Sequence, residues 1–420
     1  MLFSEKPALA HARLATGVGW ADFPLDDRFE NMFRSLMASV RTQRLVPEEW
    51  VEPQLGLVGK KGGTERIIGI YDSVAKVFFK TLWAKQRAPK AKDYAFGYVR
   101  GRRVEHAVCI QACLSWRLSA AQISHHAVLY DLRNAFFCGS HDDMTGHVES
   151  FSIAEDLPLL KQYHQRAGLR FKVLHETPHD TEGVEVVEHF RVTTGGPPGG
   201  PCSSDLFSMN FYPNVDRWLG EGGPERALWA TVPWSEKDDQ VDVSLTAFAD
   251  DLLRRVLASN CGELHRALRS DSDRLDRCLS PAGYVQNKNK KEVIPSFCGA
   301  GTTRNMKNVL GLGSVYGCKI MPQARYLGVQ LDYNNKVDVE ISMRVEASRK
   351  AYYSLGQAWY KGPRRLACLM FKCLFISTLF AGVCSLALSS RHYSRFNAII
   401  AKYGRKLLKG KGFVEVEGRK

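Results

Sequence analysis

The cysteines of this 420-residue chain lack the spacings that bind metals or build disulfide frameworks. The 11 cysteines are scattered, without a C-x-x-C pair and without paired cysteine and histidine spacing. We therefore expect no zinc site, and free thiols in a reducing compartment. The N-terminus also lacks a basic segment followed by an apolar stretch, so we expect no secretory signal.

Long hydrophobic runs are scarce as well. One run, residues 366–388, is mostly apolar and carries a single charge, at Lys372. A membrane-spanning helix needs about 20 predominantly apolar residues, so this run is long enough. Cysteine, serine and threonine dilute it, however, and a helix packed against its neighbours explains it more simply. We expect no membrane partner.

Positive charge is in excess. The chain has 58 lysines and arginines against 44 aspartates and glutamates, which gives a formal net charge of +14. Such an excess favours a polyanionic partner, because cations that neutralise phosphates release condensed counterions. A generic basic protein has the same charge balance, so charge alone does not identify a polyanionic partner. The hydrophobic share of 45% and the charged share of 24% are those of a globular protein.

Two adjacent carboxylates, Asp250 and Asp251, stand between two short apolar runs. Residues 243–249 and 252–257 each read as a buried strand, so the pair falls on the turn of a hairpin. Two bare carboxylates repel each other unless a cation compensates them. Oxygen ligands that leave positions open suit Mg²⁺, which takes the rest of its shell from water and phosphate. A solvated turn is the alternative, and a third carboxylate would argue against it.

Asp131 is that third carboxylate. It ends the apolar run 127–130, and Phe136 follows five residues later. Two-metal phosphoryl transfer needs carboxylates from separate strands, because one ion activates the attacking hydroxyl and the other stabilises the leaving pyrophosphate. A lone aspartate at a strand end more often caps the next turn. Asp131 together with Asp250 fits the catalytic requirement better.

With these residues in place, the chain resembles the reverse transcriptases, most closely those of the non-LTR (LINE-type) retrotransposon branch. Eight sequence blocks of that family occur in order along nearly the whole chain: residues 45–50, 58–68, 95–103, 131–136, 195–207, 248–251, 283–292 and 326–329. Positions that depart from the family pattern include Tyr284, in place of a leucine, and Lys291, in place of a threonine. Ile67 replaces a proline, and Pro198 replaces a glutamine, which removes a polar contact and stiffens the turn.

The resemblance implies a nucleotidyltransferase, an RNA-directed DNA polymerase that uses two Mg²⁺ ions, with Mn²⁺ as a possible substitute. Asp131 and Asp250 would ligate both metal ions, and Asp251 would support them less directly. Lys290 would donate a proton to the leaving pyrophosphate. The turn formed by Tyr326, Leu327 and Gly328 would grip the primer strand.

The resemblance also assigns the contacts to the incoming nucleotide. Lys61 and Arg66 would hold the triphosphate, and Phe136 would act as a steric gate against the ribose 2′-OH. Gly199 would let the backbone approach a templating base or the incoming nucleotide closely, because glycine has no side chain to obstruct it.

The expected fold class is α+β, with the right-hand polymerase arrangement that the resemblance implies. Residues 1–44 would be an N-terminal extension and residues 45–125 the fingers. Residues 126–335 would be the palm, an antiparallel sheet packed on helices that carries blocks A to E and is interrupted by a polar insertion at about 173–190. Residues 336–420 would be a helical thumb with a basic C-terminal tail.

The expected partners are an RNA template, a DNA primer or target, and deoxynucleoside triphosphates. An endonuclease would come from another domain or chain, because no such segment is apparent, and the location would be intracellular, in the nucleus or cytoplasm. Two alternatives stay open. One is a related enzyme, a group II intron-type maturase or an RNA polymerase, although Phe136 argues against the latter. The other is a decayed, non-catalytic nucleic-acid-binding remnant of a retrotransposon.

Overall fold

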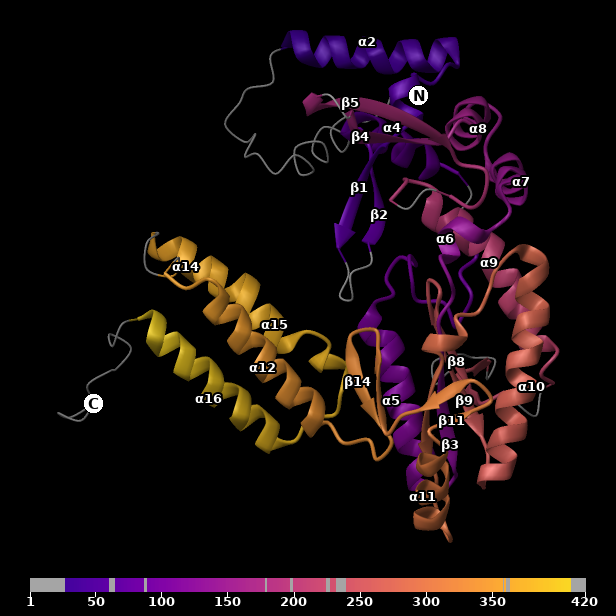
Figure 1. Ribbon diagram of the computed structural model, residues 1–420, viewed down its shortest axis with the longest axis vertical. Helices are drawn as coiled ribbons and strands as arrows, with labels where there is room; N and C mark the ends of the chain where they lie inside the picture. The colour runs from indigo at the N-terminus through magenta and orange to yellow at the C-terminus, as the bar shows by residue number, and fades with distance from the viewer. Residues whose placement is uncertain are drawn as a thin grey trace. The chain divides into compact units, whose positions relative to one another are not determined.

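The computed structural model describes residues 27–59, 65–86, 89–177, 180–196, 199–223, 227–231, 239–357, 359 and 363–408. These residues form a mixture of helices and sheets (Figure 1), as the α+β prediction requires. The chain divides into two compact units that interleave along the sequence. The first comprises residues 1–92, 132–223 and 272–286, and the second comprises residues 93–131, 224–271 and 287–420.

The first unit contains a four-stranded sheet with the order β2-β1-β4-β5. Its strands are β1 (Gln54–Gly59), β2 (Glu65–Ile70), β4 (Gly168–Thr177) and β5 (Asp180–Arg191). The expected polar insertion at about 173–190 is therefore mostly the hairpin of β4 and β5, which pair antiparallel. The sequence obscured this hairpin because polar residues occur on both sides of its alternation, so no apolar face signals a strand.

The helices of the first unit enclose its main core. They are α2 (Asp27–Gln43), α3 (Glu48–Val51), α4 (Ser73–Trp83), α6 (Ala135–Cys138), α7 (His141–Phe151), α8 (Leu157–Gln165), α9 (Ser203–Gly220) and the short η3 (Ser280–Ala282). Phe79 of α4 stacks on Tyr163 of α8 with ring centroids 4.0 Å apart. Asp72 caps α4 by accepting a hydrogen bond from the backbone of Ala75 at 2.9 Å, as N-cap residues do.

The second unit contains a six-stranded sheet with the order β11-β12-β10-β3-β9-β8. Its strands are β3 (His125–Tyr130), β8 (Leu245–Phe248), β9 (Asp251–Leu257), β10 (Glu292–Ser296), β11 (Ser314–Val315) and β12 (Cys318–Ile320). The two predicted strands that flank the Asp250-Asp251 pair are confirmed as β8 and β9, which form an antiparallel hairpin.

Alternation along the central strand β3 separates two faces of this sheet. Ala127 and Leu129 pack in one cluster with Val108 of helix α5 (Val104–Ala120). Tyr130, on the opposite face, donates a hydrogen bond to Asp271 of helix α10 (Cys261–Leu279) at 2.7 Å. All six residues of β3 are buried, because the strand lies in the middle of the sheet with helices over it.

Shorter elements complete the second unit around the sheet. Two short hairpins, β6 (Trp229–Thr231) with β7 (Gln240–Asp242) and β13 (Gln323–Tyr326) with β14 (Val329–Asp332), pair outside the sheet. The other short elements are η4 (Lys288–Lys290) and helix α11 (Thr302–Leu312).

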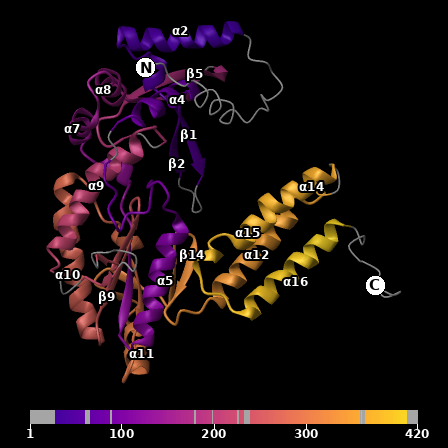
Figure 2. The same ribbon diagram turned by 180° about the vertical axis from the view of Figure 1, so that it is seen from behind.

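The C-terminal part of the second unit is helical, as predicted from residue 336 onward. Its elements are α12 (Asp338–Ser354), α14 (Arg364–Met370), η5 (Phe371–Ile376), α15 (Ser377–Phe380), η6 (Val383–Ser385) and α16 (Ser390–Leu407). Helices α12, α15 and α16 lie side by side in both views (Figures 1 and 2). A core of aromatic residues, including Tyr352, Phe375 and Tyr403, joins them.

The apolar run predicted at 366–388 forms α14, η5, α15 and η6. By length and composition, residues Arg364–Ser385 could cross a membrane, with a mean hydropathy of 2.1, and 22% of that stretch is buried inside the protein. Phe375 and Leu379 pack in the aromatic core, whereas Leu366 and Leu369 are exposed. The absence of a membrane partner and the limits of fingers, palm and thumb stay predictions.

Candidate catalytic site

The turn between β8 and β9 holds two of the predicted catalytic carboxylates. Phe248 pairs with Asp251, so Ala249 and Asp250 are the two residues of the turn. Ala249 has a φ of +57°, in the left-handed region that two-residue hairpin turns commonly use. The turn leaves Asp250 partly buried and Asp251 exposed.

Asp131 lies at the same end of the sheet, directly after β3. The register of β3 and β9 pairs Leu129 with Leu253 and Tyr130 with Leu252. Continued by one residue, this register places Asp131 opposite Asp251. Residues directly opposite on antiparallel strands have Cβ atoms about 4.5–5.5 Å apart, and like charges in that arrangement destabilise the pair. A cation between the two carboxylates would relieve this repulsion.

Two side chains from the segment directly before β10 hold Asp131 in place. Asn287 donates a hydrogen bond from Nδ2 to Asp131 Oδ2 at 2.8 Å, and its backbone N–H donates to the Asp131 carbonyl at 2.8 Å. Lys290 Nζ lies 3.3 Å from the same carboxylate oxygen. Sequence reasoning chose Lys290 but gave no role to Asn287. The signal was present, because both residues belong to the block 283–292.

Asp131 and Lys290 line a pocket of about 260 Å³ within the second unit. Five of the predicted site residues meet there: Asp131, Asp251, Lys290, Tyr326 and Leu327. Glu292, Lys319 and Arg325 add further charges of both signs to its wall. Burial raises the pKa of the Glu292 carboxyl, while Lys319 opposes this shift.

The predicted primer-gripping turn is the tight connection between β13 and β14. Leu327 and Gly328 have φ values of +47° and +85°, so both are in the left-handed region. The hydroxyl of Tyr326 lies 2.9 Å from Thr246 Oγ1 of β8, which joins this hairpin to the strand that precedes the carboxylate turn. Arg344 of α12 donates to the Gly328 carbonyl and thereby ties the turn to the C-terminal helices.

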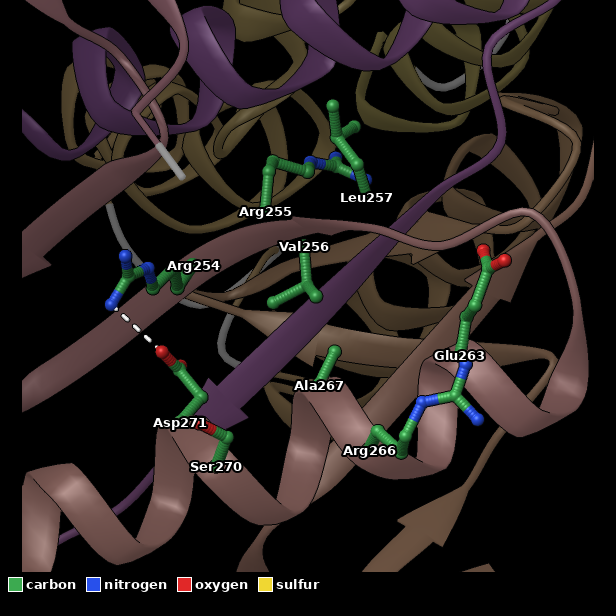
Figure 3. A pocket seen from close by; sticks show the side chains of 9 residues that line it. All are labelled: Arg254, Arg255, Val256, Leu257, Glu263, Arg266, Ala267, Ser270 and Asp271. Carbon is green, nitrogen blue, oxygen red and sulfur yellow. Dashed lines mark hydrogen bonds and ion pairs between the residues drawn. The ribbon is translucent and has the colours of Figure 1, made fainter. Parts of the chain in front are cut away.

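A buried ion pair supports the sheet behind the pocket. Arg254 of β9 donates a hydrogen bond to Asp271 of α10 at 2.9 Å, and both side chains are only 3% exposed (Figure 3). Asp271 also accepts the hydroxyl hydrogen of Tyr130, the residue that precedes Asp131. Burial and the adjacent Asp271 carboxylate raise the pKa of Tyr130. One carboxylate of α10 therefore fixes two strands that end at the site.

The remaining predicted residues belong to the first unit. Phe136 stacks on Phe207 of α9 with ring centroids 4.4 Å apart, and its carbonyl accepts a hydrogen bond from Gly196 at 2.9 Å. Gly195 has a φ of +61°, and an added Cβ would lie 2.1 Å from the Phe136 carbonyl oxygen, so only glycine fits. The blocks that contain Phe136 and Gly195, far apart in sequence, are thus in direct contact.

Four further positions of the predicted site and its blocks also belong to this part of the sequence. Gly199 has a φ of +90°, and an added Cβ would lie 3.5 Å from the carbonyl oxygen of Gly69. Arg66 is in β2, where its backbone pairs with Val58, but its side chain is not described. Lys61 and Pro198 lie outside the described residues. The roles of these residues stay predictions.

Within the described residues, no three or more histidine, cysteine, aspartate or glutamate side chains are grouped to hold a metal ion. The donor set nevertheless suits Mg²⁺. This ion binds through one or two carboxylates and completes its shell with water and substrate phosphates. Asp131 and the opposed Asp251 provide two carboxylates, and Asp250 is adjacent.

The similarity of this chain to known proteins is structural. No protein-family profile matches it, and no curated protein matches it. Two solved structures are similar. Apo telomerase from Candida tropicalis is 10% identical over 91% of this chain and 66% of its own length, with a TM-score of 0.43. The same telomerase truncated from its C-terminal domain is 11% identical over 73% of this chain and 58% of its own length, with a TM-score of 0.41. This chain therefore spans less than two thirds of either structure.

Proposed function

We propose that this chain is an RNA-directed DNA polymerase of the non-LTR retroelement type, which adds deoxynucleotides to a primer 3′-OH. The observation that carries the proposal is the pocket lined by Asp131, Asp251, Lys290 and the Tyr326–Leu327 turn. These residues come from four separate sequence blocks. A purely structural protein gains nothing from gathering repelling carboxylates at the ends of neighbouring strands, because that arrangement destabilises the fold.

The proposed reaction is an in-line transfer of a nucleotidyl group. Bound Mg²⁺ would lower the pKa of the attacking hydroxyl and neutralise charge on the phosphates. Asp131, Asp250 and Asp251 would hold the two ions. Lys290, which lines the pocket, would donate a proton to the leaving pyrophosphate. Catalysis would otherwise consist of positioning and charge stabilisation.

The other predicted residues would bind the nucleic acids and the nucleotide. The turn at Tyr326, Leu327 and Gly328 would hold the primer end, and Lys61 with Arg66 would bind the triphosphate. Phe136 would act as the gate against the 2′-OH, and its stack on Phe207 supports this role because it restrains the ring. The partners would be an RNA template and a DNA primer, with an endonuclease from another domain or chain, in the nucleus or cytoplasm.

Primer extension on a poly(A)/oligo(dT) template with Mg²⁺ and labelled dTTP tests this proposal. We expect the natural chain to incorporate dTTP, and Asp131→Asn and Asp250→Asn to lose at least ~10²–10³-fold in rate, because each removes charge that stabilises the transition state. Both variants should still bind the template-primer. Asp216→Asn is the matched control, since Asp216 pairs with Lys92 at 2.6 Å in the first unit.

Two outcomes would contradict the proposal. Extension by Asp250→Asn at the rate of the natural chain would reject the carboxylate assignment. No incorporation by the natural chain, despite salt-sensitive binding of the template-primer, would favour a decayed nucleic-acid-binding remnant.

A further inference from the structure

The segment before helix α5 is joined to the edge strand β8 just ahead of the carboxylate turn. Ala247 donates its backbone N–H to the Tyr94 carbonyl at 2.8 Å, and Phe96 donates to the Ala247 carbonyl at 2.8 Å. Ala95 and Ala247 form a parallel bridge. The segment therefore continues the sheet by one short strand, and its direction carries the chain toward the turn that holds Asp250.

Gly97 brings this segment into backbone contact with the turn. A Cβ at Gly97 would lie 2.3 Å from the backbone nitrogen of Ala249, closer than any side chain allows. Ala249 is itself in the left-handed region and directly precedes Asp250. Gly97 is thus present because two backbones touch there, and this contact places the next residue, Tyr98, beside the carboxylates.

Tyr98 has a backbone conformation that aromatic residues avoid. Its φ is +61°, and a bulky residue in the left-handed region is strained unless the surroundings impose it. Hydrogen bonds hold the ends of this segment together, because Arg102 Nη1 donates to the carbonyls of Ala95 at 2.6 Å and Asp93 at 3.0 Å. Such strain is found most often at functional sites.

The side chain of Tyr98 remains accessible from solvent, with 52% of the residue exposed. Burial of its inner part raises the pKa of the phenol, and the negative charges of Asp250 and Asp251 raise it further. The side chain therefore lies near both carboxylates, as the contact between Gly97 and Ala249 requires. A tyrosine hydroxyl can donate a hydrogen bond to a carboxylate.

We propose that Tyr98 is a positioning residue of the carboxylate site, whose hydroxyl orients Asp250 and Asp251 for a divalent cation. This inference rests on the proposed function, in which the carboxylates bind that cation. The hydroxyl holds the carboxylates in one arrangement against their mutual repulsion, and a cation then finds them in place. Neighbours of metal ligands that act in this way commonly change metal affinity 10–100-fold when they are removed.

Cation binding by the full chain, without substrate, tests the inference. Mn²⁺ affinity is measured by electron paramagnetic resonance for the natural chain, Tyr98→Phe and Tyr98→Gly. Tyr98→Phe keeps the ring and removes only the hydroxyl, whereas Tyr98→Gly also relieves the backbone strain. We expect both variants to bind Mn²⁺ at least ~10-fold more weakly. Tyr353→Phe is the matched control, because Tyr353 is 55% exposed in α12 and bonds to Lys406.

The variants separate the possible outcomes. Natural affinity in Tyr98→Phe with a loss only in Tyr98→Gly would mean that the ring merely packs, and would overturn the inference. Natural affinity in both variants would overturn it as well. If Asp250→Asn also bound Mn²⁺ like the natural chain, the carboxylates would not be the cation site, and the proposed function would fail instead. Primer extension by Tyr98→Phe should therefore need a higher Mg²⁺ concentration than extension by the natural chain.

Discussion

Asp271 accepts two hydrogen bonds in the interior of the second unit, from Tyr130 at 2.7 Å and from Arg254 at 2.9 Å. Asp271→Asn leaves the Arg254 guanidinium buried without its counter-charge. Removing one partner of a buried ion pair costs about 3–5 kcal/mol. Urea unfolding should show a loss of this size in the free energy of unfolding.

Tyr130→Phe tests the hydrogen bond to Asp271 separately from the ion pair. It removes only one hydrogen bond to a charged group, which contributes about 1.5–3 kcal/mol, and leaves the ion pair intact. Equal stability losses in Tyr130→Phe and Asp271→Asn would show that the ion pair adds nothing beyond that hydrogen bond.

The strand β3 begins with two histidines, His125 and His126. Both side chains are buried. His125 Nε2 is 2.8 Å from the hydroxyl of Ser115, and His126 Nε2 is 2.9 Å from the Ala258 carbonyl. Because these partners satisfy the ring nitrogens, two polar residues can occupy a central strand. Local sequence does not reveal such partners, since they come from distant segments.

The buried His126 of β3 should make the free energy of unfolding depend on pH. Burial lowers the pKa of His126 to about 4, and of His125 likewise. Between about pH 6.5 and 4 the unfolded chain binds more protons than the folded one, so the free energy of unfolding falls as the pH falls. His126 alone should account for about 2 kcal/mol between pH 7 and pH 5.

Urea unfolding at pH 7 and pH 5 checks this pH dependence. His126→Gln can still donate to Ala258 and accept from Ser296, as His126 does, but it cannot take up a proton. The stability of this variant should therefore change less with pH than that of the natural chain. An unchanged pH dependence would mean that other groups cause the acid destabilisation.

The sequence predicts a feature when the residues that determine it are neighbours in the chain, and misses it when they are far apart. The hairpin around Asp250 was predictable because its two strands adjoin in the sequence and read as short apolar runs. The position of Asp131 opposite Asp251 was not, because the register between β3 and β9 joins segments far apart in the chain. Gly97 and Tyr98 could not be recognised either, since the backbone contact at Gly97 is made with Ala249, which is far away in the sequence.

At the scale of the whole molecule, the net charge of +14 should make binding of a template-primer depend steeply on salt. Part of this charge lies along α16, where Arg391 and Lys402 are exposed. If α16 lies along a nucleic-acid backbone, removing both cations by Arg391→Ala with Lys402→Ala removes two phosphate contacts. The slope of log affinity against log salt should then become shallower by about two.

The matched control removes two exposed cations from another helix of the same unit, by Arg304→Ala with Lys307→Ala in α11. Both double variants lower the net charge by two, so a general field effect would change the two salt slopes equally. A change confined to the α16 variant would place the nucleic acid along α16. Equal slopes for the two variants and the natural chain would mean that neither helix contacts phosphates, and that the excess charge acts elsewhere on the molecule.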